Sequence, residues 1–264
     1  MTPVEISRGT GPVVLGLPHT GTHLPSDISA RLNDRGQMLA DTDWHVDRLY
    51  AGLLPDATLV RANFHRYVID ANRPPDGESL YPGQNTTGLV PLTDFDGRPI
   101  WAQPPDDGDI AARLQAYHEP YHGALEAELA RVQTRHGVAM LFDCHSIRSE
   151  IPHLFDGSLP DLNIGTADGA SCARSVERAV RDICARTDKY SHVLNGRFKG
   201  GWTTRHYGRP HEGIHAIQME LAQSTHLKSE TPPFAFSDRK AAQLRPLLSE
   251  ILHSLAALAP KLRS

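Results

Sequence analysis

The sequence predicts an α/β protein whose mixed, mostly parallel sheet is covered by helices on both faces. Short apolar runs rich in β-branched residues alternate along the chain with longer segments of helical periodicity, the pattern of strands joined by helices. The 264 residues suffice for one large core, and no shift in composition marks a boundary, so we expect a single domain over residues 1–264. The 39% hydrophobic and 22% charged residues are typical of a globular chain.

The first third of the chain contains three predicted strands and one predicted helix. Residues 13–17 form a short apolar run that ends at Pro18, which predicts a buried strand. Apolar side chains recur at roughly helical spacing over residues 43–54, with Asp41 or Thr42 as the expected cap of this helix. Two further short runs, residues 57–62 and 67–69, predict strands.

A long loop and a long helix occupy the middle of the chain. Residues 73–105 are rich in Pro, Gly, Asp and Asn and predict a loop, and long ordered loops in compact domains are usually functional. Over residues 109–136 apolar side chains are spaced by three and four, which predicts one helix that is kinked at Pro120 and ends at Gly137.

The last part of the chain adds strands, helices and a glycine-rich segment. The predicted strands are residues 138–142 and 214–221, and the predicted amphipathic helices are residues 169–186 and 237–258. Residues 196–210 combine glycines with Arg205 and Tyr207, which predicts a mobile lid that closes over an anionic ligand.

Charge and composition limit the partners and the compartment. A net charge of −4 with no cluster of Lys or Arg argues against a nucleic acid or an anionic membrane as the main partner, which leaves a small molecule. No apolar run is long enough to span a membrane, and residues 1–11 lack the pattern of a secretion signal. We therefore expect a cytoplasmic protein, either a monomer or a small homo-oligomer.

The cysteines and the glycine pattern exclude two kinds of site. Cys144, Cys172 and Cys184 are too few and too irregular for a disulfide framework or a cysteine zinc site, so we expect reduced thiols. The sequence contains no P-loop or dinucleotide fingerprint, so no nucleotide cofactor is expected.

Reactive side chains follow three of the predicted strands. His19 comes after the first strand, His145 lies in the polar run after residues 138–142, and Glu220 ends the late strand. Ligands of open α/β sheets bind where strands deliver residues to the carboxyl edge. Catalytic zinc takes three N or O protein ligands and keeps one position open for water, so this edge predicts a site for one divalent metal ion. Imidazole and carboxylate suit Zn, Mn, Fe or Co, of which zinc is the expected metal.

The sequence leaves the third metal ligand open. Asp43 and His45 both lie at the start of the predicted helix. Asp43 is the first choice, with His45 and His23 as alternates. A cap is the competing role for Asp43, because acidic residues are common in the first turn of a helix.

Glu220 and two arginines indicate the chemistry. A carboxylate is costly to bury among apolar strand residues unless it is used or paired, so we expect Glu220 to be a general base, with an ion pair as the alternative. Arg66 and Arg73 suit a carboxylate-bearing amide substrate, because guanidinium binds carboxylates through paired hydrogen bonds and also stabilises an oxyanion. Asp70 is then expected to orient an Arg or His side chain.

Six motifs spread over most of the chain resemble those of the N-formylglutamate amidohydrolase (N-formylglutamate deformylase) family. They are PHTGTHLP (18–25), DTDWHVDRL (41–49), VIDANRP (68–74), LYPGQN (80–85), DCHSI (143–147) and GGWTTR (200–205). More distantly, Arg66 with residues 70–73, residues 143–145 and the Glu220 strand look like parts of aspartoacylases and zinc carboxypeptidases. The resemblance implies a three-layer α/β/α fold of the zinc-exopeptidase, phosphorylase/hydrolase-like kind.

The resemblance also implies an activity. It is the metal-dependent hydrolysis of N-formyl-L-glutamate to L-glutamate and formate, the last step of a histidine-degradation route. Another N-acyl amino acid, such as N-formyl-L-aspartate, is the alternative substrate. The expected reaction uses a water activated by the metal, with Glu220 as the base and Arg66 polarising the formyl carbonyl.

The distant relatives suggest further roles, and the sequence departs from them at one point. In those enzymes the residues that match Asn72 and Arg73 hold a substrate carboxylate, and the residue that matches His145 binds zinc. Their first motif is His-x-x-Glu, with both residues on the metal. Here His19 is followed three residues later by Thr22, so another residue must supply that ligand.

Two other classes of function compete with this hydrolase. A cysteine enzyme would use Cys144 as nucleophile and His145 as base, but neighbours along a strand point to opposite faces. A non-catalytic protein that binds a metal and an acidic metabolite would keep His19 and His145, yet it would have no use for a buried Glu220.

Overall fold

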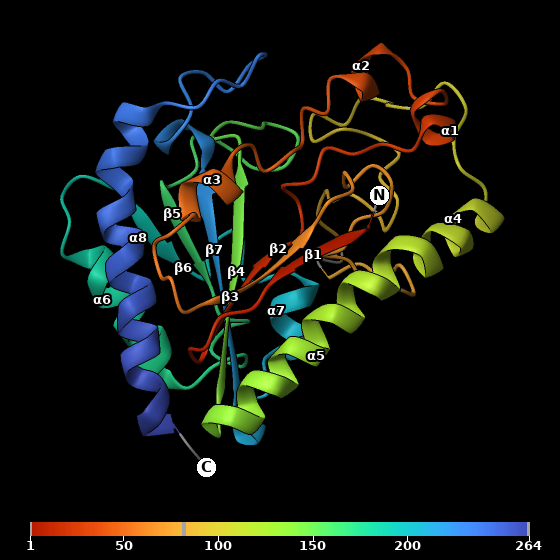
Figure 1. Ribbon diagram of the computed structural model, residues 1–264. Coiled ribbons are helices and arrows are strands. Elements are labelled where there is room, and N and C mark those ends of the chain that lie inside the picture. The colour runs from red at the N-terminus through yellow and green to blue at the C-terminus, as the bar shows by residue number, and fades with distance from the viewer. Residues whose placement is uncertain (1, 81–82, 263–264) are drawn as a thin grey trace.

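A mixed sheet forms the centre of the protein (Figure 1). The computed structural model describes residues 2–80 and 83–262, and within these residues the sheet has seven strands in the order β1-β3-β2-β4-β7-β5-β6. They are β1 (Val4–Ser7), β2 (Val13–Leu17), β3 (Thr58–Ala62), β4 (Ala139–Ile147), β5 (Leu162–Gly165), β6 (His192–Leu194) and β7 (Ile214–Ala222). Strands β3, β2, β4 and β7 are parallel, whereas β1 and β5 are antiparallel to β3 and β7, so the predicted mixed, mostly parallel sheet is confirmed.

Helices cover both faces of this sheet, which confirms the three-layer α/β/α fold. One face carries α3 (Val46–Tyr50), α6 (Arg174–Ala185) and α8 (Asp238–Leu258), and the other carries α4 (Asp107–Arg113), α5 (Glu119–His136) and α7 (Trp202–Tyr207). Figure 1 shows α6 and α8 on one side of the strands and α4 and α5 on the other. The short helices are α1 (Ser26–Ser29), α2 (Asp34–Gln37), η2 (Pro210–Glu212), η3 (Gln223–Thr225) and η4 (Ala259–Leu262).

Alternation along β4 and β7 separates apolar from reactive side chains. In β4, Phe142 and Cys144 belong to the core under α8, whereas Leu141 belongs to the core under α5. Because successive residues of a strand point to opposite faces, Asp143 and His145 lie on the α5 side with Leu141. The same rule in β7 places Gln218 and Glu220 on the face that Ala216 shares with α5.

Several predicted elements have different bounds in the structure, among them the helix expected over residues 169–186, which begins only at Arg174 as α6. Residues 67 and 68 lie in a turn, with Val68 N bonded to His65 O, and residue 69 has no regular secondary structure, so the strand predicted over residues 67–69 is wrong. Helix α3 begins only after His45, which has a left-handed φ of 61°, so neither Asp41 nor Thr42 caps it. Strand β4 continues to Ile147, and its polar run therefore lies inside the strand rather than after it.

The middle of the chain follows the prediction closely. The helical segment that begins with α4 continues through the single π-type turn η1 (Leu114–His118) into α5, directly before Pro120. Gly137 ends α5 with a φ of 73°, as expected of a C-terminal glycine. The described part of residues 73–105 contains turns and isolated bridges but no helix or strand, which confirms the long loop.

Candidate active site

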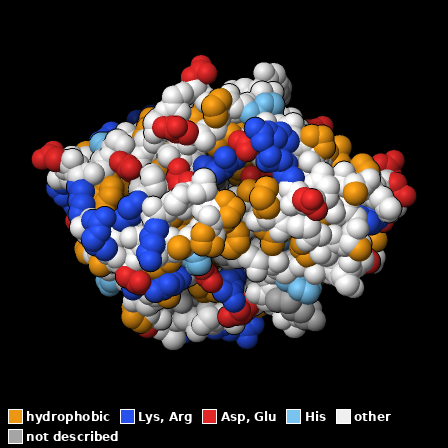
Figure 2. Space-filling view, turned by 90° about the horizontal axis from the view of Figure 1, so that it is seen from above, with side chains coloured by type: hydrophobic (Ala, Val, Ile, Leu, Met, Phe, Trp, Pro, Cys, Tyr) orange, Lys and Arg blue, Asp and Glu red, His pale blue; other side chains and the backbone are white. Residues whose placement is uncertain are grey.

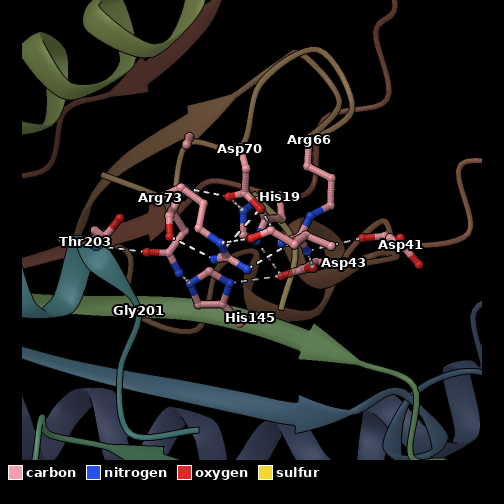
Figure 3. A network of polar contacts seen from close by, with 12 residues as sticks. His19, Asp41, Asp43, Arg66, Asp70, Arg73, His145, Gly201 and Thr203 are labelled. Carbon is pink, nitrogen blue, oxygen red and sulfur yellow. Dashed lines mark hydrogen bonds and ion pairs between the residues drawn. The ribbon is translucent and has the colours of Figure 1, made fainter. Parts of the chain in front are cut away.

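Three side chains of metal-ligand type meet beside the carboxyl ends of β2 and β4 (Figure 3). His19 follows β2, Asp43 lies in the loop before α3, and His145 lies in β4. Asp43 Oδ2 is 3.8 Å from His19 Nδ1 and 3.2 Å from His145 Nδ1, and the two imidazole centroids are 5.0 Å apart. All three residues are buried, and the structure thus brings together the first-choice ligand set of the sequence analysis.

The outer nitrogen of His19 is held by Asp70. His19 Nε2 lies 2.7 Å from Asp70 Oδ1, and Arg66 Nη2 donates a 2.6 Å hydrogen bond to Asp70 Oδ2. Burial and the nearby Arg66 lower the pKa of His19, so the ring is neutral at pH 7 and we assign its proton to Nε2, facing Asp70. The lone pair of Nδ1 is then directed toward Asp43, which is the tautomer that a metal site requires.

His145 lies between two carboxylates. Its Nδ1 is 3.2 Å from Asp43 Oδ2, and its Nε2 is 2.9 Å from Asp143 Oδ1. Burial alone would lower the pKa of His145, but Asp143 and Asp43 together raise it well above the usual value, so both ring nitrogens carry protons. A cation bound here would replace the proton between His145 and Asp43, since a ligating nitrogen must be deprotonated. The other ring nitrogen would stay next to Asp143.

Strand β7 brings Glu220 beside His145. The two residues are direct partners in the parallel register of β4 and β7. Glu220 is 7% exposed, and burial raises the pKa of its carboxyl group to about 8. Gln218 Nε2 donates a 3.0 Å hydrogen bond to Glu220 Oε2, and Gly201 N donates to Gln218 Oε1 at 2.7 Å. Among the residues that the structure describes, the side chain that donates to Glu220 is therefore the amide of Gln218 rather than an arginine.

A cavity that is open to solvent is lined by these side chains. Among the described residues that line it, the carboxylic acids are Asp43 and Glu220, the histidines are His19 and His145, and the arginines are Arg66, Arg73 and Arg197. Apolar side chains complete the wall, namely Phe95, Ile147, Leu154 and Phe198. Clefts with apolar walls and a few convergent polar groups are typical small-molecule sites, and three guanidinium groups favour an anionic ligand.

Most of the predicted site residues line this cavity. They are His19, Asp43, Arg66, Asn72, Arg73, His145 and Glu220. Neither Arg205 nor Tyr207 is among the described residues that line it: Arg205 Nε donates to Gly200 O, and the Tyr207 hydroxyl is 3.0 Å from His122 Nδ1. The segment expected to be a lid contains helix α7 and packs on β7.

The two alternate metal ligands lie apart from the cluster. His45 Nε2 is 3.0 Å from the main-chain oxygen of Phe234, and His23 pairs through its backbone with Phe64. In the part of the chain that the structure describes, neither belongs to the group that could hold a metal ion.

Sequence reasoning missed three residues of the site. Asp143 could have been found, because it lies two positions before His145 and therefore on the same face of one strand. Gln218 lies two positions before Glu220 in the same way. Arg197 lies in the segment 196–210 that was expected to close over an anionic ligand, but it follows no predicted strand, and Arg205 and Tyr207 were chosen in its place.

The surface seen in Figure 2 carries Lys and Arg side chains interspersed with Asp and Glu, so no single sign of charge dominates this face. Among the described residues, none of the helices is both long enough and apolar enough to cross a membrane.

Known proteins share both the sequence and the fold. Residues 11–227 match the family described as N-formylglutamate amidohydrolase. The chain is 46% identical over 258 residues to an N-formylglutamate deformylase of Pseudomonas aeruginosa and 45% identical over 257 residues to one of Pseudomonas putida, with 96% of each chain covered. The crystal structure of an N-formylglutamate amidohydrolase from Ralstonia eutropha JMP134 superposes with a TM-score of 0.83 at 23% identity and covers 99% of both chains. A gene product of Agrobacterium tumefaciens gives a TM-score of 0.74 at 18% identity, covering 98% of this chain and 96% of its own.

These similarities in sequence identify the class of enzyme. The chain is an amidohydrolase, an enzyme that acts on a linear amide. More narrowly, it belongs to the N-formylglutamate amidohydrolase family, as its six motifs predicted.

Proposed function

We propose that this protein hydrolyses N-formyl-L-glutamate to L-glutamate and formate with the help of one divalent metal ion, zinc by preference. The observation that carries the proposal is the convergence of His19, Asp43 and His145, with Glu220 beside them, at the end of a cavity lined by arginines. The names of the two Pseudomonas relatives support the choice of substrate. A role at the end of a histidine-degradation route and a cytoplasmic location both remain predictions.

The residues present fit a catalytic metal ion. Two imidazoles and one carboxylate are the donor set of many hydrolytic zinc sites, which leave one position for water. Asp70 and Asp143 stand behind the two imidazoles and would fix their orientation. When bound, the cation supplies Lewis acidity, which polarises a carbonyl and lowers the pKa of a water molecule.

Glu220 would move the proton in this reaction. As a general base it takes a proton from the attacking water, and as a general acid it then gives this proton to the leaving nitrogen. Burial raises the pKa of its carboxyl group to about 8 in the metal-free protein, and the positive charge of a cation would lower it toward the working range.

Arg66 would stabilise negative charge on the formyl oxygen. Its guanidinium lines the cavity, and its Nη1 is 3.8 Å from Asp43 Oδ1. The bond from Nη2 to Asp70 holds the group in place before the substrate binds, so no reorganisation is needed as charge develops.

Asn72 and Arg73 would bind the α-carboxylate, which lies next to the scissile amide in the substrate. Asn72 Nδ2 is 3.3 Å from His145 Nε2, so this amide already lies beside the metal ligands. Arg73 Nε and Nη2 donate to Thr87 O and Thr87 Oγ1, which orients the guanidinium at the cavity wall.

The alternatives are weaker in the structure. Cys144 is fully buried and lies in the core under α8, on the face of β4 opposite to His145, which removes the geometry of a cysteine nucleophile. A non-catalytic binding protein does not require an acid beside the metal ligands. The competing substrates are other N-formyl or N-acyl amino acids, such as N-formyl-L-aspartate and N-acetyl-L-glutamate.

The test is the release of formate or acetate by metal-replete and chelated protein. We expect turnover of N-formyl-L-glutamate at the zinc-loaded enzyme, slower turnover of N-formyl-L-aspartate and of N-acetyl-L-glutamate, and loss of at least about 99% of the rate after chelation, because the carbonyl is no longer polarised. Added zinc, manganese or cobalt should restore the rate, and thiol alkylation should leave it unchanged. Equal rates with and without chelator would contradict the metal-dependent mechanism.

Gly201 offers a second test of the site. A methyl group on Gly201 would stand 2.2 Å from Asn72 Nδ2, which is far inside contact distance. We expect Gly201→Ala to displace the Asn72 amide and to lower kcat/KM for N-formyl-L-glutamate about 10- to 100-fold, since small misplacements of positioning groups have effects of this size. Gly123→Ala is the matched control, because a methyl group there meets nothing within 4 Å. Equal activity of both variants would show that the position of Asn72 is unimportant.

A further inference from the structure

We propose that Arg197 binds the side-chain carboxylate of the substrate and thereby selects acidic N-formyl amino acids. This inference rests on the proposed function and deepens it by naming the residue that binds the side-chain carboxylate of the substrate. Arg197 lies before α7, in the segment where the sequence analysis had expected Arg205 and Tyr207 to bind the ligand.

Among the three arginines of the cavity, Arg197 is the one that suits the side-chain carboxylate of the substrate. Of the three arginines among the described lining residues, Arg66 is bonded to Asp70 at 2.6 Å and faces the metal ligands. Arg73 follows Asn72 directly, and Asn72 reaches His145, so Arg73 serves the carboxylate beside the scissile amide. N-formyl-L-glutamate carries two carboxylates, and each of them then meets its own guanidinium.

The guanidinium of Arg197 is oriented by two loops. Its Nε donates to Leu154 O at 3.0 Å and its Nη2 donates to Asn85 O at 3.0 Å. The group also lies over the ring of Phe198, with 5.3 Å between Arg197 Cζ and the ring centroid. A planar fork fixed by two main-chain carbonyls loses little further freedom when it binds a carboxylate, which favours affinity and selectivity.

The wall beside Arg197 suits the methylene groups of a glutamate side chain. Ile147, Leu154 and Phe198 line the same cavity and pack in one small apolar cluster. Burying two methylene groups against such a wall is favourable.

Arg197→Gln decides the proposal when it is tested with a charged and a neutral substrate of the same shape. With N-formyl-L-glutamate we expect kcat/KM to fall about 100-fold, chiefly through KM, because the lost contact is a charge-assisted pair at a carboxylate. With N-formyl-L-glutamine, whose side chain is neutral, we expect a change of less than about threefold. Arg197→Lys should keep part of the preference for the acid, because the charge remains without the fork.

Two controls separate the possible explanations. Arg73→Gln should lower kcat/KM for both substrates, because both carry the α-carboxylate. Arg209→Gln, at an exposed arginine paired with Glu212, should change neither. Equal losses for the two substrates in Arg197→Gln would assign Arg197 a structural role and overturn the inference, as would an unchanged preference for the acid. The wild-type rate with N-formyl-L-glutamate tests the proposed function separately: no formate release from that enzyme overturns both.

Discussion

Glu220→Gln should lower kcat for N-formyl-L-glutamate about 10²- to 10⁴-fold, the range that a well-placed general acid–base group contributes. The amide has nearly the same shape as the carboxylate but accepts no proton from water. It can still accept the hydrogen bond from Gln218 Nε2 through its oxygen, so the local structure should persist. We expect the metal content and the melting temperature to stay close to those of the wild type, so that the loss is chemical.

Steady-state kinetics together with metal analysis by mass spectrometry check this expectation. Glu212→Gln is the matched control, because Glu212 is an exposed acid paired with Arg209 on the surface. A Glu220→Gln variant that turned over at the normal rate would remove the main reason to regard the cavity as catalytic. The non-catalytic binding protein would then be the better description.

Asp70→Asn should destabilise the fold and weaken metal binding together. Asp70 is fully buried, its Oδ2 accepts from Arg66, and its Oδ1 accepts from the main-chain N of Asn72. Neutralising it removes the nearest counter-charge of Arg66 and leaves only the more distant Asp43 carboxylate, 3.8 Å away. Breaking a buried pair costs about 3–5 kcal/mol. His19 also loses the carboxylate that orients its ring, which should weaken metal affinity about 10- to 100-fold.

Urea denaturation and zinc titration with a competing chelator measure the two effects separately. Asp47→Asn is the control: Asp47 forms a partly exposed ion pair with Arg61, and ion pairs that solvent can reach contribute about 0–1 kcal/mol. If Asp70→Asn unfolded at the same urea concentration as the wild type, the buried network around Arg66 would not contribute to the free energy of unfolding.

The sequence predicted the layers of the fold because apolar periodicity reports local structure directly. Residues 13–17 and 138–142 are continuous apolar runs of the kind that only a sheet covered on both faces buries. Residues 214–221 are also mostly apolar, although His215, Gln218 and Glu220 interrupt the run. Strands β1, β5 and β6 carry weaker patterns, since β1 is mostly exposed and β6 spans only three residues. The apolar run Tyr67–Ile69 was misread because a buried turn and a buried strand have the same composition.

The candidate site was predictable where residues follow strands and not where loops supply them. His19 and His145 could be placed at one edge because parallel strands end together. Asp43 could not be separated from a helix cap, since the start of α3 depends on the left-handed conformation of His45, which local propensity does not indicate. Arg197 reaches the cavity through the packing of two loops, and contacts so distant in sequence leave no local signal.

The residue-for-residue pairing of β4 with β7 makes the chemistry intolerant of length changes in either strand. Inserting or deleting one amino acid upstream of position 220 within β7 would invert the side chains beyond it and turn the acid into the apolar layer beneath α8. Every reactive residue would still be present in the chain, yet His145 and Glu220 would lie on opposite faces of the sheet. Insertions and deletions are thus expected in the segments that connect the strands, whereas β4 and β7 should keep a fixed number of residues.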